Sequence, residues 1–155
     1  MSALAIVAAC LLAGSLIYCV LIVLAARSYL AQRIPAGNHP APISVLKPLS
    51  GIDEGLETNL RSFFEQDHPE YEILFAVREV DDPAAGIVAV LRKEFPSRAA
   101  RLIVTGEPPY ANAKVFSLDC MLAEARHDLL VMSDSDIRVR PDFLRGVATE
   151  FAAGL

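Results

Sequence analysis

Two aspartates separated by one residue, Asp134 and Asp136, are the first candidates for chemistry in this sequence. They follow the apolar run 129–132, so a strand over that run would present both carboxylates at its end. Carboxylates placed in this way can share one hard divalent cation, Mg²⁺ or Mn²⁺, and the cation can neutralise a diphosphate leaving group. With nine aspartates in the chain, chance alone gives roughly 0.5 such pairs. The alternative is therefore a solvated turn capped by an aspartate.

A second acidic pair, Asp81 and Asp82, stands directly before Pro83. An acid before proline at the start of a helix is a common N-terminal cap, favoured by the helix dipole. The same side chains could instead accept hydrogen bonds from a uracil or ribose group at the edge of a sheet. One segment can serve both purposes, so the sequence leaves both roles open.

Two lysines lie near the predicted ligand-binding edge, and one of them could contact a phosphate. Lys47 lies near the end of the apolar run 43–49, and Lys114 belongs to the segment Asn112-Ala113-Lys114 at the start of a predicted helix. The amino end of a helix attracts phosphate through its free N–H groups and its dipole, and a lysine there adds a full positive charge. The alternative for Lys114 is an ordinary solvated lysine.

Several common ligand-binding signatures are absent from the sequence. Neither GxGxxG nor GxxxxGK[ST] occurs, which argues against a dinucleotide dehydrogenase and a P-loop NTPase. No Gly-x-Ser-x-Gly elbow supports a hydrolase. A net charge of −5 without a basic run argues against a nucleic-acid partner.

The elements that must position these residues alternate along the chain. Short apolar runs predict strands, and apolar residues at helical spacing predict helices. Strands are predicted over 43–49, 71–77, 101–104 and 129–132, and helices over 54–66, 83–95, 112–126 and 141–151. Four strand–helix pairs indicate a doubly wound α/β fold with a mostly parallel sheet. Such a sheet binds ligands beyond the carboxyl ends of its strands, where the acids and lysines above fall.

Two details of the predicted helices can be compared with a structure. Asp53 is the expected N-cap of the first helix. The third helix is expected to bury a stripe made of Val115, Leu118, Leu122 and Ala125.

The amino-terminal segment is apolar. Residues 1–26 contain none of the 14 Lys and Arg or the 19 Asp and Glu residues. As a helix, residues 3–26 would be about 36 Å long, enough to cross a hydrocarbon core of about 30 Å, and the run is too long for a signal peptide. Arg27 and Arg33 follow it, so the positive-inside rule places the remainder in the cytoplasm. We therefore predict a transmembrane helix over 1–26, a linker over 27–42 and a globular domain over 43–155.

Six segments occur in an informative order: SVLKPLSGID (44–53), NLRSFFEQD (59–67), YEIL (71–74), DDPA (81–84), NAKV (112–115) and SDSDIRV (133–139). Together they resemble the ceramide glucosyltransferases of glycosyltransferase family 21 and their bacterial relatives that glycosylate hopanoids. The resemblance implies a GT-A fold, a UDP-glucose or UDP-N-acetylglucosamine donor, a membrane-lipid acceptor and inversion at the anomeric carbon.

The resemblance also assigns roles to particular residues. It carries the metal-binding motif onto Asp134 and Asp136, and the donor-nucleotide contact onto Asp82 beside Asp81. Lys47 and Lys114 match family lysines and are expected to contact the substrate. In the animal enzymes the position of Asp136 is often glycine, so this aspartate favours a bacterial member located in the inner membrane.

Two features of the family are missing from these residues. The family has a later aspartate as general base and a Gln-x-x-Arg-Trp motif, whereas this sequence contains no tryptophan. The globular part is also roughly 100 residues shorter than a GT-A domain with its acceptor half. We therefore expect an incomplete, donor-binding part that is inactive alone. The alternatives are a family 2 glycosyltransferase with a polyprenyl-phosphate or polysaccharide acceptor, and a membrane-anchored, non-catalytic nucleotide-binding protein.

Overall fold

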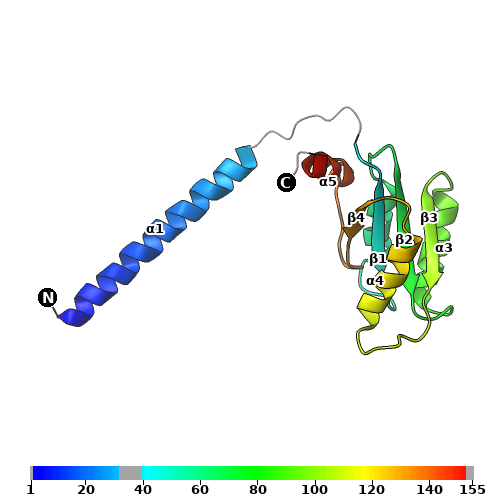
Figure 1. The fold of residues 1–155 in the computed structure, drawn as a ribbon, viewed down its shortest axis with the longest axis horizontal. Helices are drawn as coiled ribbons and strands as arrows, with labels where there is room; N and C mark the ends of the chain where they lie inside the picture. Colours follow the sequence, from blue (N-terminus) through cyan, green and yellow to red (C-terminus); the bar gives the residue numbers. More distant parts are fainter. Residues whose placement is uncertain (1, 32–39, 153–155) are drawn as a thin grey trace. The chain divides into compact units, whose positions relative to one another are not determined.

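A computed structural model describes residues 2–31 and 40–152 of the chain. The chain divides into two units, Met1–Ile34 and Pro35–Leu155, and each is described by itself. The first unit contains the long helix α1 (Ala3–Ala31), and the second is an α/β domain (Figure 1).

Helix α1 has 29 residues, which at 1.5 Å per residue makes it about 43 Å long. None of its residues is buried. Among the described residues, it is the one helix that is long and apolar enough to cross a membrane by length and composition. The helix continues through Arg27 to Ala31, so the first five residues of the expected linker are helical. Residues 32–39, which include Arg33, lie outside the described residues.

The α/β domain is built on a parallel sheet of four strands. They are β1 (Ile43–Pro48), β2 (Tyr71–Val77), β3 (Ala99–Val104) and β4 (Leu129–Met132), and their spatial order is β3-β2-β1-β4. All three pairings are parallel, and Ile43 at the start of β1 is level with Tyr71 and Leu129. Every residue of β2 is buried, as expected for a strand with neighbours on both sides. The predicted fold class is therefore confirmed.

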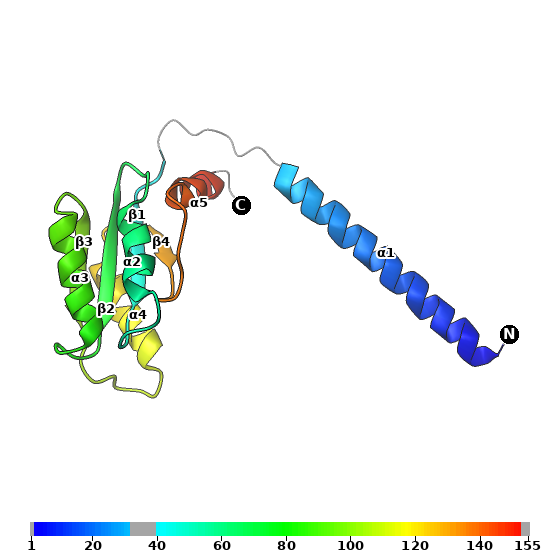
Figure 2. The same ribbon diagram turned by 180° about the vertical axis from the view of Figure 1, so that it is seen from behind.

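Helices cover both faces of this sheet (Figures 1 and 2). They are α2 (Leu56–Phe64), α3 (Pro83–Glu94), α4 (Ala113–Glu124) and α5 (Phe143–Ala152). Side chains of a strand alternate between the two faces. Ile73, Phe75 and Val77 therefore pack with α2, α3 and α5, whereas Leu74 and Ala76 pack with Met121 of α4.

Two expectations about the helices are wrong. Helix α2 begins at Leu56, and its N-cap is Gly55, whose positive φ of 75° glycine adopts readily, so Asp53 is not the cap. In α4 the buried residue is Met121, with Leu118 and Ala125 packed beside it, while Val115 and Leu122 are exposed. The cause is that α4 packs mainly against β1 and β2 of the sheet, so a narrow stripe of the helix is covered.

Candidate functional site

The loop that follows β4 carries the two candidate metal ligands. The strand ladder ends where Met132 lies opposite Leu46, and the Ser133 amide then donates to the Leu46 carbonyl at 3.1 Å. Beyond that bond the chain leaves the sheet and presents Asp134 and Asp136, both exposed. The two acids therefore stand at the carboxyl end of a strand, as the sequence predicts.

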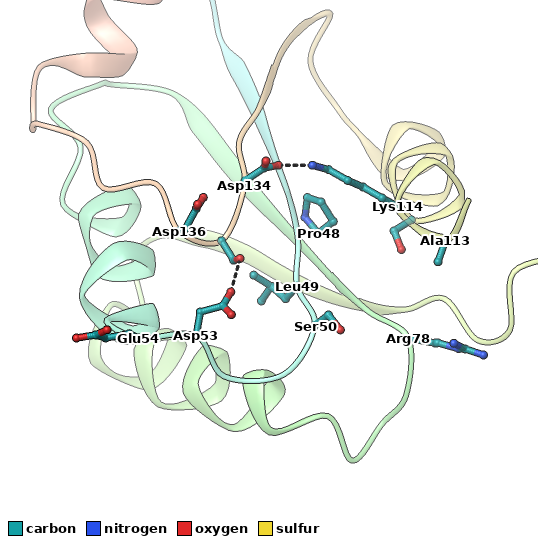
Figure 3. A pocket seen from close by; sticks show the side chains of 12 residues that line it. Pro48, Leu49, Ser50, Asp53, Glu54, Arg78, Ala113, Lys114, Asp134 and Asp136 are labelled. Atoms are coloured by element: carbon teal, nitrogen blue, oxygen red, sulfur yellow. Dashed lines mark hydrogen bonds and ion pairs between the residues drawn. The ribbon is translucent and has the colours of Figure 1, made fainter. Parts of the chain in front are cut away.

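Two side chains from the β1–α2 region contact the middle of this loop. Asn59 donates from its amide nitrogen to the Ser135 carbonyl at 3.3 Å. The Ser135 hydroxyl donates to the Asp53 carboxylate at 2.9 Å. Figure 3 shows this second bond beside the two acids. Asp53 thus orients the loop between the two candidate ligands instead of capping a helix.

Lys114 reaches the same loop from helix α4. The Asn112 side chain caps this helix by accepting from the Val115 amide at 3.1 Å, which places Lys114 in the first turn. Its Nζ lies 2.6 Å from Oδ1 of Asp134, and both side chains are more than half exposed (55% and 58%) (Figure 3). Lys114 is therefore a surface lysine that pairs with a candidate metal ligand.

A pocket of about 670 Å³ lies where these segments meet, a size typical of small-molecule sites. Its walls come from the ends of β1, β2 and β4 and from the amino end of α4 (Figure 3). The lining residues are Pro48, Leu49, Ser50, Asp53, Glu54, Arg78, Ala113, Lys114, Ser117, Asp134, Ser135 and Asp136. Four of them are acids and two are basic, so the pocket carries an excess of negative charge.

Lys47 lies beneath this pocket and is completely buried. Its Nζ donates to the Asp134 backbone carbonyl at 2.7 Å and to the Ser133 hydroxyl at 3.1 Å. The ring of Phe63 lies 3.9 Å from the ammonium group. Burial lowers the pKa of Lys47 to about 8, although the charges of Asp134 and Asp136 act in the opposite direction. Lys47 is not among the residues that line the pocket, so its expected contact with substrate stays a prediction.

The acidic pair Asp81 and Asp82 is not part of the pocket lining. Asp82 is the N-cap of α3, where its carboxylate accepts from the Ala84 amide at 2.9 Å. Both of its oxygens also accept from the Gly51 amide, each at 3.1 Å. Gly51 has a positive φ of 67°, which turns the chain sharply after the lining residue Ser50. The capping role is therefore present, and Asp82 acts on the pocket through the loop after β1.

Sequence reasoning does not identify several polar residues of the pocket, among them Arg78 and Asp53. Arg78 follows β2 directly, so the rule of looking just after each strand could have found it; in the structure it pairs with Glu107. Asp53 was assigned to a helix cap because it precedes an apolar periodic segment. No sequence signal indicates its bond to Ser135, because 82 residues separate the two.

The donor set fits a hard divalent cation that binds together with a ligand. Asp134 and Asp136 supply carboxylate oxygens and Ser135 a hydroxyl, all on one pocket wall. Within residues 2–31 and 40–152 there is no cluster of three or more His, Cys, Asp or Glu side chains able to hold a metal. Mg²⁺ commonly uses one or two carboxylates and takes its other ligands from phosphates and water. These residues therefore suit a cation whose remaining ligands come from a bound phosphate and water.

Comparison with known sequences places the chain among glycosyltransferases. The model of Glycosyl transferase family 21 matches residues 5–155. Ceramide glucosyltransferase 1 of Caenorhabditis elegans is 37% identical over 107 residues, which are 69% of this chain and 23% of that protein. The ceramide glucosyltransferase of Komagataella phaffii is 29% identical over 112 residues, covering 70% of this chain and 22% of the relative. The chain thus spans less than a quarter of the length of these relatives.

Two solved structures share the fold of the α/β domain. The mannosyltransferase PcManGT from Pyrobaculum calidifontis, in complex with GDP-Man and Mn²⁺, has a TM-score of 0.61 at 20% identity, covering 83% of this chain and 39% of that one. S. aureus TarS 1–349 in complex with UDP-GlcNAc has a TM-score of 0.57 at 19% identity, covering 72% and 31%. At these identities the likeness concerns the GT-A-type fold alone.

Proposed function

The chain belongs to glycosyltransferase family 21, and we propose that it is the donor-binding part of a membrane-anchored glycosyltransferase. The donor is UDP-glucose or UDP-N-acetylglucosamine, and the acceptor is the hydroxyl of a membrane lipid such as ceramide or a hopanoid. Ceramide glucosyltransferases among the sequence relatives and a UDP-GlcNAc complex among the structural neighbours support this choice.

The observation that carries the proposal is the charge of the pocket at the carboxyl edge of the sheet. Its lining holds four acids and two bases, so a diphosphate alone would be repelled. A divalent cation held by the carboxylates would offset that repulsion. Asp134 and Asp136 are the residues that would hold the cation, and when bound it supplies charge neutralisation for the leaving UDP.

The residues of this chain then act on the donor in three ways. Asp134 and Asp136 would hold the cation that the diphosphate needs, and Lys114 at the amino end of α4 donates to a diphosphate oxygen. The loop after β1, which Asp82 connects to α3, borders the space for the nucleoside.

In the transfer, the bond from the acceptor oxygen to the anomeric carbon forms while the bond from that carbon to the UDP oxygen breaks, with inversion. The hydroxyl proton passes to a carboxylate base outside these 155 residues.

The membrane location follows from α1 in this proposal. The helix is long enough to cross a bilayer, and Arg27 and Arg33 follow its apolar part. We place the α/β domain on the cytoplasmic side of a bacterial inner membrane, where UDP-sugars are available and a lipid headgroup is within reach. Protease should digest the domain in inverted vesicles and spare it in right-side-out vesicles, and protection in inverted vesicles would contradict this orientation.

The binding of UDP tests the donor site directly. The full-length protein in detergent should bind UDP in Mn²⁺ and lose at least about tenfold in affinity in EDTA, measured by calorimetry. Asp134→Asn should reduce the Mn²⁺-dependent part by a similar factor. Asp142→Asn is the matched control, because Asp142 is an exposed acid whose partner is Arg140, away from the pocket. Equal UDP affinity in Mn²⁺ and EDTA would refute the metal assignment and leave the acids as turn residues.

A further inference from the structure

Lys47 makes contacts that no substrate-binding role explains. A buried charge is costly unless it is paired or fully hydrogen-bonded. Here the ammonium lies over the Phe63 ring and donates to the Ser133 hydroxyl and to the Asp134 backbone carbonyl. Both acceptors belong to the loop that carries the candidate metal ligands. An apolar side chain would fill the same space without the cost of burying a charge, so the charge and its hydrogen bonds require another reason.

The position of Lys47 along β1 supplies that reason. The ladder between β1 and β4 ends at the pair Leu46 and Met132, one residue before Lys47. After the Ser133 amide bond to Leu46, the described residues of β1 make no further backbone bond to the loop. The Lys47 side chain adds the next hydrogen bond between β1 and the loop, because its Nζ donates to the carbonyl of Asp134 at 2.7 Å. On the other side, Asn59 holds the carbonyl of Ser135 at 3.3 Å.

We propose that Lys47 is a positioning residue for the two metal-binding acids. Its ammonium group fixes the backbone under Asp134, so that the carboxylates of Asp134 and Asp136 keep their places on the pocket wall. This inference rests on the proposed function, because it concerns the same donor site.

The test compares metal-dependent and metal-independent binding in the same variant. Lys47→Met keeps most of the length of the side chain and removes the charge and both hydrogen bonds. In the full-length protein in detergent, UDP affinity in Mn²⁺ should fall about tenfold, while UDP affinity in EDTA should change less than twofold. Binding of Mn²⁺ in the presence of UDP, followed by the EPR signal of free Mn²⁺, should weaken by the same factor.

Val45→Ala separates positioning from general stability. Val45 is a fully buried residue of the same strand and contacts no residue of the 133–136 loop through a hydrogen bond. Its truncation removes buried methyl groups and should lower the temperature of thermal unfolding. If Val45→Ala lowers Mn²⁺-dependent UDP affinity as much as Lys47→Met does, at a comparable loss of thermal stability, Lys47 has only a structural role and the proposal is overturned.

Ser133→Ala covers the case in which Lys47→Met does not fold. It removes one acceptor of the ammonium and leaves the buried charge in place. A two- to fivefold loss confined to the Mn²⁺-dependent affinity supports the proposal, and an unchanged affinity overturns it. If the wild-type protein shows no Mn²⁺-dependent UDP binding at all, the proposed function itself fails, which is a different result from a wild type that binds and variants that bind equally well.

Discussion

Lys114→Met should change the affinities for metal and nucleotide in opposite directions. In the structure the Lys114 ammonium pairs with the Asp134 carboxylate at 2.6 Å, so the lysine occupies a ligand oxygen that the cation needs. The substitution frees that oxygen and removes a positive charge near the cation, and both changes should strengthen metal binding. It also removes the proposed hydrogen-bond donor to the diphosphate, which should weaken nucleotide binding.

The size of the metal effect follows from the exposure of the Lys114–Asp134 ion pair, and the size of the nucleotide effect from the charged hydrogen bond to phosphate. Both partners are more than half exposed, and such ion pairs are worth about 0.2–1 kcal/mol. Mn²⁺ alone should therefore bind up to about fivefold more tightly to Lys114→Met. A hydrogen bond from a charged donor to phosphate is worth about 1.5–3 kcal/mol, so UDP in saturating Mn²⁺ should bind about 10- to 100-fold more weakly.

EPR of free Mn²⁺ and calorimetry of UDP on the full-length protein measure the two affinities separately. Lys93→Met is the matched control, because Lys93 is an exposed lysine of α3, the helix on the other side of the sheet from α4. It changes net charge equally and should leave both affinities unchanged. If Lys114→Met weakens Mn²⁺ binding in the absence of UDP, the lysine does not compete with the cation and the reasoning is wrong.

Three other substitutions have defined outcomes. Asp82→Asn should weaken UDP binding about 3- to 10-fold without abolishing its Mn²⁺ dependence, because the carboxylate holds Gly51 beside the pocket and not the metal; calorimetry in Mn²⁺ and EDTA checks this. Burial lowers the pKa of His68 below its ordinary 6.5, so on acidification the unfolded chain takes up the proton before the folded one does. The stability of the folded state should therefore decrease as pH falls below 6.5. Between pH 7.5 and 5.5, the unfolding temperature should decrease less in His68→Asn than in the wild type. Glu72→Gln should lower the free energy of unfolding by about 1–3 kcal/mol, measured by denaturant titration, because the buried carboxylate accepts from Ser44, Arg101 and the Arg126 amide.

The sheet and the edge that carries the site could be predicted from sequence because they depend on local patterns. Strands β2 and β4 begin and end where the apolar runs do. Parallel strands place their carboxyl ends at one edge, so the acids after β4 are expected at the same edge as the ends of the other strands. The ion pair between Lys114 of α4 and Asp134 is seen only in the structure. The buried residues of α4 differ from the predicted ones because they depend on which strands the helix packs against. The spacing of apolar residues along the helix does not indicate which strands those are.

Lys47 and Asp82 show what strand-end reasoning could not predict. A lysine at the end of an apolar run is expected to reach solvent, yet the Phe63 ring from α2 and the loop after β4 enclose it. Asp82 was correctly expected as a possible cap, but its second contact depends on the left-handed turn at Gly51, 31 residues earlier. Both outcomes depend on long-range contacts that single-residue patterns do not encode.

Two lysines contact Asp134 in different ways. Lys47 bonds to its backbone carbonyl and Lys114 to its carboxylate, which in our proposal must exchange the lysine for a cation. Lys47 is buried, so breaking its bond to the backbone carbonyl would leave the desolvated ammonium with the Ser133 hydroxyl as its one remaining acceptor among the described residues. The bond from Lys114 to the carboxylate is exposed, and water replaces it at little cost. The backbone can therefore stay fixed while the carboxylate passes from a lysine to a cation. Lys114, once released, lies at a helix amino end where a diphosphate gains both its charge and the helix dipole. In the proposed mechanism, Asp134 and Lys114 neutralise each other before donor binding, and each would gain an oppositely charged partner when the donor and its cation bind.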